Sequence, residues 1–228
     1  MNNAVSTKTH TACAGRQITS VIHPAWALIL KRLFDMGFSL VVLLLIWPLI
    51  GIVAIGIKLS SPGPVFYRGV RTGLNGKPFR ILKFRTMVED AESLGGPTTG
   101  THDKRVTRIG ALLRRTKLDE FPQFLNVLVG DMSLVGPRPE VLEYTATYEG
   151  EEKCILSMRP GITDYASIEF ADLDDRVGDT DPDRYFRENI MPRKTDLRVK
   201  YVKEWSFRSD LHILWMTFLR IIKRIVVR

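Results

Sequence analysis

An acidic pair, Asp119-Glu120, lies in a part of the sequence that is otherwise rich in lysine and arginine. The cations around it are Lys83, Arg85, Arg105, Arg108, Arg114, Arg115 and Arg138. Guanidinium groups bind phosphate oxygens in a bidentate manner, and neighbouring cations favour the ionised form of a carboxyl group. A carboxylate nucleophile and a phosphorylated substrate could therefore share this region. An Asp-Glu pair before a helix is also a common cap with solvated charges, so the pair alone leaves both interpretations open.

The motifs of several other catalytic classes are missing from the sequence. It contains no H-E-x-x-H, no paired C-x-x-C, no G-x-S-x-G and no G-x-G-x-x-G followed by a helix. The glycines before Lys77 do not make a phosphate-binding loop, because their spacing is wrong and Pro78 stands where Ser or Thr would contact magnesium. With only Cys13 and Cys154, a disulfide framework and a Cys-based zinc site are excluded, and a reducing compartment is favoured.

Short helices are expected to position the acidic pair. Apolar residues at helical spacing predict helices over 89–94, 109–115 and 120–128. Asp119 stands at the N-cap position of the last of these, and Pro122 is tolerated in its first turn.

A β-hairpin is expected upstream of these helices. Two short apolar runs, 65–67 and 79–84, flank the turn-forming dipeptide Asn75-Gly76. The preceding Ser61-Pro-Gly-Pro64 stops a helix and begins an extended path. Together with the helices, the hairpin predicts a helix-rich α+β fold.

The charge balance points to negatively charged partners. The chain has 33 Lys and Arg against 25 Asp and Glu, a net charge of +8. Nucleic acid, anionic lipid and phosphorylated small molecules all fit such a charge. A nucleic-acid binder has little further support, because the sequence contains no aromatic-basic platform and no recognisable binding motif.

Residues 36–57 contain no charged side chain and are long enough for the roughly 20 residues that cross a bilayer core. Both flanks are basic, with Lys31 and Arg32 before and Lys58 after, and positive residues prefer the cytoplasmic side. Pro48, near the middle, bends or breaks a helix. A re-entrant helix that enters and leaves by one face and an ordinary kinked span are equally compatible with these residues.

The two ends of the chain differ in character. Residues 1–24 are polar and without periodicity, which predicts a flexible tail that is not a secretory signal peptide. Residues 206–228 place Trp215, Phe218 and other apolar residues on one side of a helix and Arg220, Lys223 and Arg224 on the other. Such a helix can lie in an anionic membrane interface or pack on the domain core.

The segment 103–140 closely resembles the bacterial sugar transferases, the monotopic phosphoglycosyl transferases. It reads DKRVTRIGALLRRTKLDEFPQFLNVLVGDMSLVGPRPE. The resemblance continues at 31–35 (KRLFD), 61–66 (SPGPVF), 83–87 (KFRTM), 159–163 (RPGIT) and 206–211 (SFRSDL), so it covers nearly everything after the tail.

The resemblance implies a membrane enzyme that transfers a sugar 1-phosphate from a UDP-sugar to a polyprenyl phosphate and releases UMP. In this family the reaction uses a covalent intermediate, which would form on Asp119, while Glu120, with Asp119, would hold Mg²⁺. Arg114 and Arg138 match phosphate-handling positions, and we add Lys83, Arg85 and Arg105. The enzyme would lie at the cytoplasmic face of the bacterial inner membrane and begin the synthesis of a surface glycan. A non-catalytic scaffold of a glycan assembly complex is the alternative.

Four segments follow from this interpretation: a tail over 1–24, a re-entrant membrane helix broken at Pro48 over 25–60, a catalytic domain over 61–205 and an interfacial helix over 206–228. Two positions depart from the family pattern. Trp47 replaces a small polar residue before Pro48, and 164–170 (DYASIEF) differs from the usual continuation after 163. That second segment is expected to contact the donor.

Overall fold

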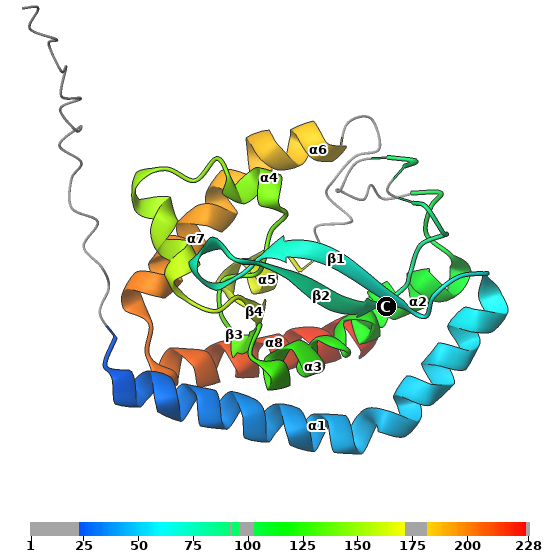
Figure 1. Cartoon of the computed structure of the whole chain (residues 1–228), viewed down its shortest axis with the longest axis horizontal. Helices are drawn as coiled ribbons and strands as arrows, with labels where there is room; N and C mark the ends of the chain where they lie inside the picture. Colours follow the sequence, from blue (N-terminus) through cyan, green and yellow to red (C-terminus); the bar gives the residue numbers. More distant parts are fainter. Residues whose placement is uncertain (1–22, 92, 96–102, 172–181, 227–228) are drawn as a thin grey trace, which may run out of the picture.

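A computed structural model describes residues 23–91, 93–95, 103–171 and 182–226. The expected tail over 1–24 therefore lies almost wholly outside the described residues. The helices are α1 (Ala25–Ser60), α2 (Arg108–Thr116), α3 (Gln123–Val129), α4 (Leu142–Thr145), α5 (Tyr165–Glu169), α6 (Pro182–Tyr185), α7 (Met191–Glu204) and α8 (Phe207–Val226). The strands are β1 (Phe66–Thr72), β2 (Pro78–Phe84), β3 (Ser133–Val135) and β4 (Gly161–Thr163). This confirms the helix-rich α+β fold (Figure 1).

The predicted hairpin is confirmed. β1 and β2 pair antiparallel, with Phe66 opposite Phe84 and Thr72 opposite Pro78. Asn75 and Gly76 both have positive φ, 56° and 75°, in the short 3₁₀ turn that joins the strands. Asn and Gly adopt this backbone conformation at the lowest cost, which explains why the dipeptide marks the turn. A second, parallel pair joins β3 to β4.

The predicted helix over 109–115 is confirmed as α2, whose first turn is capped by the Thr107 hydroxyl accepting from the Gly110 amide. The expectation that Asp119 caps the next helix is wrong. Lys117 adopts the left-handed conformation with φ 58°, which ends α2 and leads into a 3₁₀ turn over Leu118–Glu120. α3 begins only at Gln123, with Pro122 at its N-cap, so the Asp119 carboxylate is not used as a helix cap.

The expectation of a helix over 89–94 is also wrong. The described residues of this segment form turns, and Asp90 has a positive φ of 57°. A left-handed residue interrupts the i→i−4 hydrogen-bond pattern, so apolar spacing alone could not extend a helix through it.

α1 is the dominant exposed apolar element of the molecule. Among the described residues it is the one helix long and apolar enough to cross a membrane, and only 6% of its most apolar window is buried. A core helix of a soluble protein would be mostly buried instead. Pro48 lies inside this 36-residue helix, which continues through it and bends past its middle (Figure 1).

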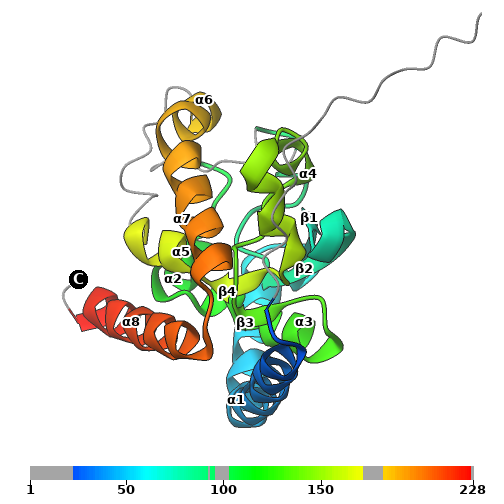
Figure 2. The ribbon, with the colours of Figure 1, turned by 90° about the vertical axis from the view of Figure 1, so that its left-hand side faces the viewer.

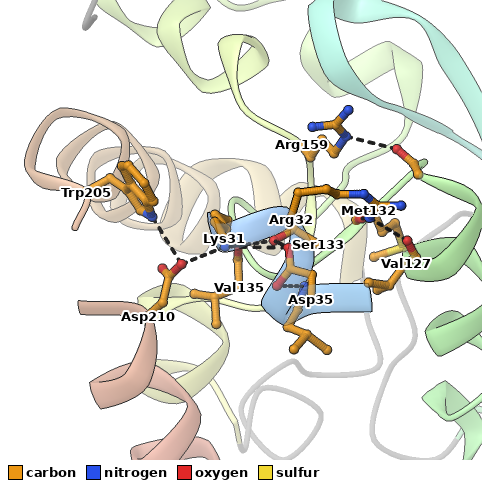
Figure 3. A network of polar contacts seen from close by, with 12 residues as sticks. Lys31, Arg32, Asp35, Val127, Met132, Ser133, Val135, Arg159, Trp205 and Asp210 are labelled. Carbon is orange, nitrogen blue, oxygen red and sulfur yellow. Dashed lines mark hydrogen bonds and ion pairs between the residues drawn. The ribbon is translucent and has the colours of Figure 1, made fainter. Parts of the chain in front are cut away.

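Both ends of α1 pack against the same folded domain. At the first end, Lys31 donates to the Val135 carbonyl (2.9 Å) and pairs with Asp210 of α8 (2.6 Å), while Asp35 accepts from the Ser133 hydroxyl (2.6 Å; Figure 3). Near the other end, Ile57 is buried in a cluster with Phe84 and Leu113. The exposed middle of α1 is therefore held at two points of one domain.

α8 packs one side on the domain core and exposes the other. Asp210 and Ile213 are buried, and Asp210 also accepts hydrogen bonds from Tyr201 (2.7 Å) and Trp205 (3.1 Å). Its other side exposes Trp215 (58%) and Phe218 (53%). Figures 1 and 2 place α1, α3 and α8 at one end of the molecule, opposite α4 and α6. This end thus carries exposed apolar side chains on α1, on α8 and, at Leu125 and Val129, on α3.

Candidate active site

The centre of the site is a cluster of one carboxylate and two cations that come from three separate elements. Glu120, in the 3₁₀ turn after α2, accepts a bidentate ion pair from Arg138, which follows β3. Lys83 of β2 donates to the same carboxylate at 3.1 Å. Arg138 is also held by the Ile162 carbonyl at 2.8 Å. The structure therefore brings together three of the residues that the sequence predicted.

Charge and burial set the ionisation of Glu120. Burial opposes the ionised form, but the Arg138 and Lys83 cations outweigh it and hold the pKa of Glu120 well below its usual value. Glu120 is thus a carboxylate that stays charged and keeps both cations in place.

Asp119, the adjacent residue, has a different environment. It is 7% exposed, and its Oδ1 atom has no hydrogen-bond partner within the described part of the chain. Burial raises the pKa of Asp119, the negative charge of Glu120 raises it further, and Lys83, Lys117 and Arg114 oppose the rise. A weakly solvated carboxylate with a free oxygen is suited to attack an electrophile.

The other predicted cations have structural partners. Arg114 donates from Nε to the Thr86 hydroxyl (2.9 Å) and lies close enough to Asp119 to lower its pKa. Arg85 is buried against the backbone carbonyls of Ser61 and Pro62, at the end of α1. Arg105 pairs with Asp103 at 2.6 Å. Arg114 thus acts on the pKa of Asp119, and Arg85 joins the end of α1 to the hairpin.

The comparison with known proteins matches most of the chain to one family. The sequence profile described as "Bacterial sugar transferase" matches residues 26–224. The chain belongs to the bacterial sugar transferase family. The matched range includes nearly all of α1 and of α8 and the cluster around Glu120.

Three relatives illustrate the similarity of this sugar transferase to curated proteins. UDP-glucose:undecaprenyl-phosphate glucose-1-phosphate transferase of Escherichia coli (strain K12) is 38% identical over 83% of this chain and 39% of its own length. The protein with the same name from Caulobacter vibrioides is 38% identical over 82% and 67%, respectively. Exopolysaccharide production protein PSS of Rhizobium leguminosarum bv. phaseoli is 40% identical over 83% and 94%.

The coverage differs among these relatives. The chain spans about two-fifths of the length of the E. coli protein and of a Xanthomonas campestris protein with the same name (39% and 38%). It spans nearly the full length of the Rhizobium protein.

Sequence reasoning missed the buried charges that support Arg138 in the sugar transferase. Asp164 accepts from the Arg138 backbone amide (2.9 Å) and pairs with Arg198 of α7 (3.3 Å). Arg198, 1% exposed, also pairs with Glu140 (2.7 Å). These residues are distant in sequence, so no local pattern links them, although Glu140 ends the 103–140 segment and Asp164 directly follows 159–163. The buried Asp164 carboxylate also accepts two hydrogen bonds from Ser167, so both of its oxygens are bonded within the protein. Asp164 therefore supports the loop that carries Arg138.

The acidic pair provides oxygen ligands that fit Mg²⁺. Mg²⁺ in phosphate-transferring sites is commonly bound by one or two carboxylates plus substrate phosphates and water. Asp119 Oδ1 is unpartnered among the described residues, and Glu120 uses three of the roughly four lone-pair directions of a carboxylate. Within the described ranges no group of three or more His, Cys, Asp or Glu could hold an ion by itself, so the remaining ligands would come from the substrate.

Proposed function

We propose that this sugar transferase moves a sugar 1-phosphate from a UDP-sugar to a polyprenyl phosphate, such as undecaprenyl phosphate, and releases UMP. The main observation behind this proposal is the buried Asp119 carboxylate with an unpartnered oxygen, next to the Glu120, Arg138 and Lys83 cluster. The names of the E. coli and Caulobacter relatives state a transfer of glucose 1-phosphate to undecaprenyl phosphate. The same chemistry on this chain would begin the assembly of a bacterial surface glycan.

The reaction would occur in two displacements at one carboxylate. In the first, Asp119 attacks the sugar-bearing phosphorus, a bond forms between its carboxylate oxygen and phosphorus, and the diphosphate bridge breaks to release UMP. In the second, an oxygen of the polyprenyl phosphate attacks the same phosphorus and Asp119 leaves as a free carboxylate. Two successive displacements let a single site serve two substrates that repel each other.

The cations of the site would lower the electrostatic cost of both steps. A diphosphate, a polyprenyl phosphate and Asp119 are all negative, so preorganised positive charge is needed at the reacting phosphorus. Arg138, Lys83 and Arg114 are already oriented by Glu120 and Thr86 and need little reorganisation when the substrate binds. Mg²⁺, held by Glu120 and Asp119, would neutralise further phosphate charge when bound.

The placement of α1 supports a location at the cytoplasmic face of the inner membrane. Its two ends pack on one domain, and its middle exposes apolar side chains. A helix that enters and leaves the bilayer by the same face would satisfy both contacts, and its basic flanks, Lys31 and Lys58, would stay on the cytoplasmic side. The apolar side of α8 would then lie in the membrane interface.

The proposed reaction predicts nucleotide release that depends on both substrates. Detergent-purified protein should release UMP from at least one member of a panel of UDP-sugars, and sustained release should require both undecaprenyl phosphate and Mg²⁺. With the acceptor withheld, intact mass spectrometry should detect a single phosphosugar adduct. Failure of every donor in a broad panel to release nucleotide would contradict the proposal and favour the scaffold interpretation.

The proposed topology predicts that both ends of α1 are accessible from one side. Trp26→Cys and Leu59→Cys replace exposed residues at the two ends, in a protein that carries Cys13→Ser and retains the buried Cys154. A membrane-impermeant maleimide should label both in inverted inner-membrane vesicles and neither in right-side-out vesicles. Asp196→Cys, at an exposed position of α7, marks the side of the catalytic domain. Labelling of Trp26→Cys and Leu59→Cys from opposite sides would establish a spanning helix.

A further inference from the structure

Gln123, the first residue of α3, has a fully buried side chain whose amide has no hydrogen-bond partner. Its exposed fraction is 0%, and both Oε1 and Nε2 lack a partner among the residues that the structure describes. Burying an amide without a hydrogen bond destabilises a folded protein. A stability role alone therefore does not explain a glutamine at this position.

Two neighbouring contacts determine where Gln123 lies. Three residues before it, Glu120 accepts from Lys83 (3.1 Å), and three residues after it, Asn126 accepts from the Leu82 backbone amide (2.8 Å). Residues three apart in a helical segment lie on the same face. Gln123 thus faces β2 between these two contacts, on the side of α3 that adjoins the Glu120 cluster.

Asn126 shows what a structural amide on this face of α3 looks like. Its Oδ1 accepts from Leu82, and its Nδ2 donates to the Arg80 carbonyl at 2.9 Å, so both ends of the amide join α3 to β2. Gln123 is more completely buried than Asn126 and makes neither kind of contact. The two amides on one helix face therefore differ in their hydrogen bonding.

A second unpartnered polar atom occurs close to Gln123 in the chain. Asp119 Oδ1, four residues earlier, is buried and lacks a partner within the described residues, and no hydrogen bond joins it to the Gln123 amide. One bound ligand could satisfy both groups, if it offered an electrophilic atom to the Asp119 carboxylate and a hydrogen-bond acceptor to the Gln123 amide. A phosphoryl group has both, since its phosphorus is attacked and its oxygens accept hydrogen bonds.

We propose that Gln123 is a further substrate-contacting residue, whose Nε2–H donates a hydrogen bond to a phosphoryl oxygen of the sugar nucleotide at the phosphorus that Asp119 attacks. This inference rests on the proposed function. Arg138 and Lys83 both donate to Glu120, and Gln123 would add a neutral hydrogen-bond donor that Glu120 does not occupy. A neutral amide orients a phosphoryl oxygen without competing for the Asp119 carboxylate as a further cation would.

The test compares near-isosteric substitutions of the two amides. Gln123→Met removes a buried amide that has no partner among the described residues, so Tm should rise by about 2–4 °C. The kcat/KM for the UDP-sugar should fall by about 10- to 100-fold, because the variant loses a hydrogen bond to a charged group. Asn126→Leu removes a fully bonded amide, so its Tm should fall. Because the bond would form at the reacting phosphorus, most of the Gln123→Met loss should lie in kcat rather than in KM.

The outcomes separate this inference from the proposed function. If the wild type releases no nucleotide from any UDP-sugar, the proposed function fails, and the inference fails with it. If the wild type is active and Gln123→Met matches its kcat/KM, the function stands and Gln123 makes no substrate contact. If Gln123→Met lowers Tm or prevents folding, its amide is a structural group, for instance one bonded to an internal water, and the inference is likewise overturned.

Discussion

Asp119→Asn is expected to abolish sugar-phosphate transfer, with nucleotide release reduced by about 10³-fold or more, because an amide oxygen is a far weaker nucleophile than a carboxylate. The phosphosugar adduct should disappear as well. Since Asp119 is a buried acid whose Oδ1 has no hydrogen-bond partner among the described residues, its neutralisation should leave Tm unchanged or raise it. Nucleotide release, intact mass and thermal unfolding, measured on one preparation, check the three expectations.

A matched control for this substitution is Asp196→Asn, which neutralises an exposed carboxylate on α7. It should retain wild-type activity and form the adduct. An Asp119→Asn protein that turned over at the wild-type rate would contradict the assigned nucleophile, even though membership in the family would remain. A fall in Tm large enough to unfold the variant would mean that the lost activity reports on the fold.

Arg138→Met is expected to lower kcat/KM by about 10²- to 10³-fold and to lower stability as well. Glu120 would lose its bidentate partner and keep only Lys83, so a buried carboxylate would be left with incomplete compensation. The reacting phosphate would lose a preoriented guanidinium at the same time. Steady-state nucleotide release and thermal unfolding measure the two effects on the same protein.

Two further variants separate the contributions of Arg138. Arg138→Lys keeps the positive charge but not the planar fork, and its activity should lie between those of the wild type and Arg138→Met. Arg80→Met removes an exposed arginine of β2 and should change neither activity nor Tm appreciably. Equal activity of Arg138→Met and the wild type would show that the Glu120 cluster is only a structural ion pair.

Local sequence patterns correctly predicted the elements whose structure depends mainly on neighbouring residues. The hairpin around Asn75-Gly76 follows from two residues that tolerate positive φ, and α2 follows from apolar spacing behind a Thr cap. The apolar character of 36–57 is likewise a property of composition alone. The same reasoning failed at 89–94, where the left-handed Asp90 interrupts the helical pattern that apolar spacing indicates. It also failed at the start of α3, where residues 118–120 form a 3₁₀ turn and the α-helix begins only at Gln123.

The sequence by itself determined the chemical types present in the site: an acidic pair, several lysine and arginine cations and a family motif around them. Only the tertiary structure decided which of them come together and which atoms each of them contacts. Lys83, Glu120 and Arg138 come from three elements, and Arg198 reaches Asp164 and Glu140 across the fold. The same packing leaves Asp119 Oδ1 and the Gln123 amide buried without a hydrogen-bond partner among the described residues, and it joins both ends of α1 to one domain. Hydrogen bonding, burial and pKa depend on which atoms lie within a few ångströms, and residue spacing along the chain does not specify contacts over such long sequence separations.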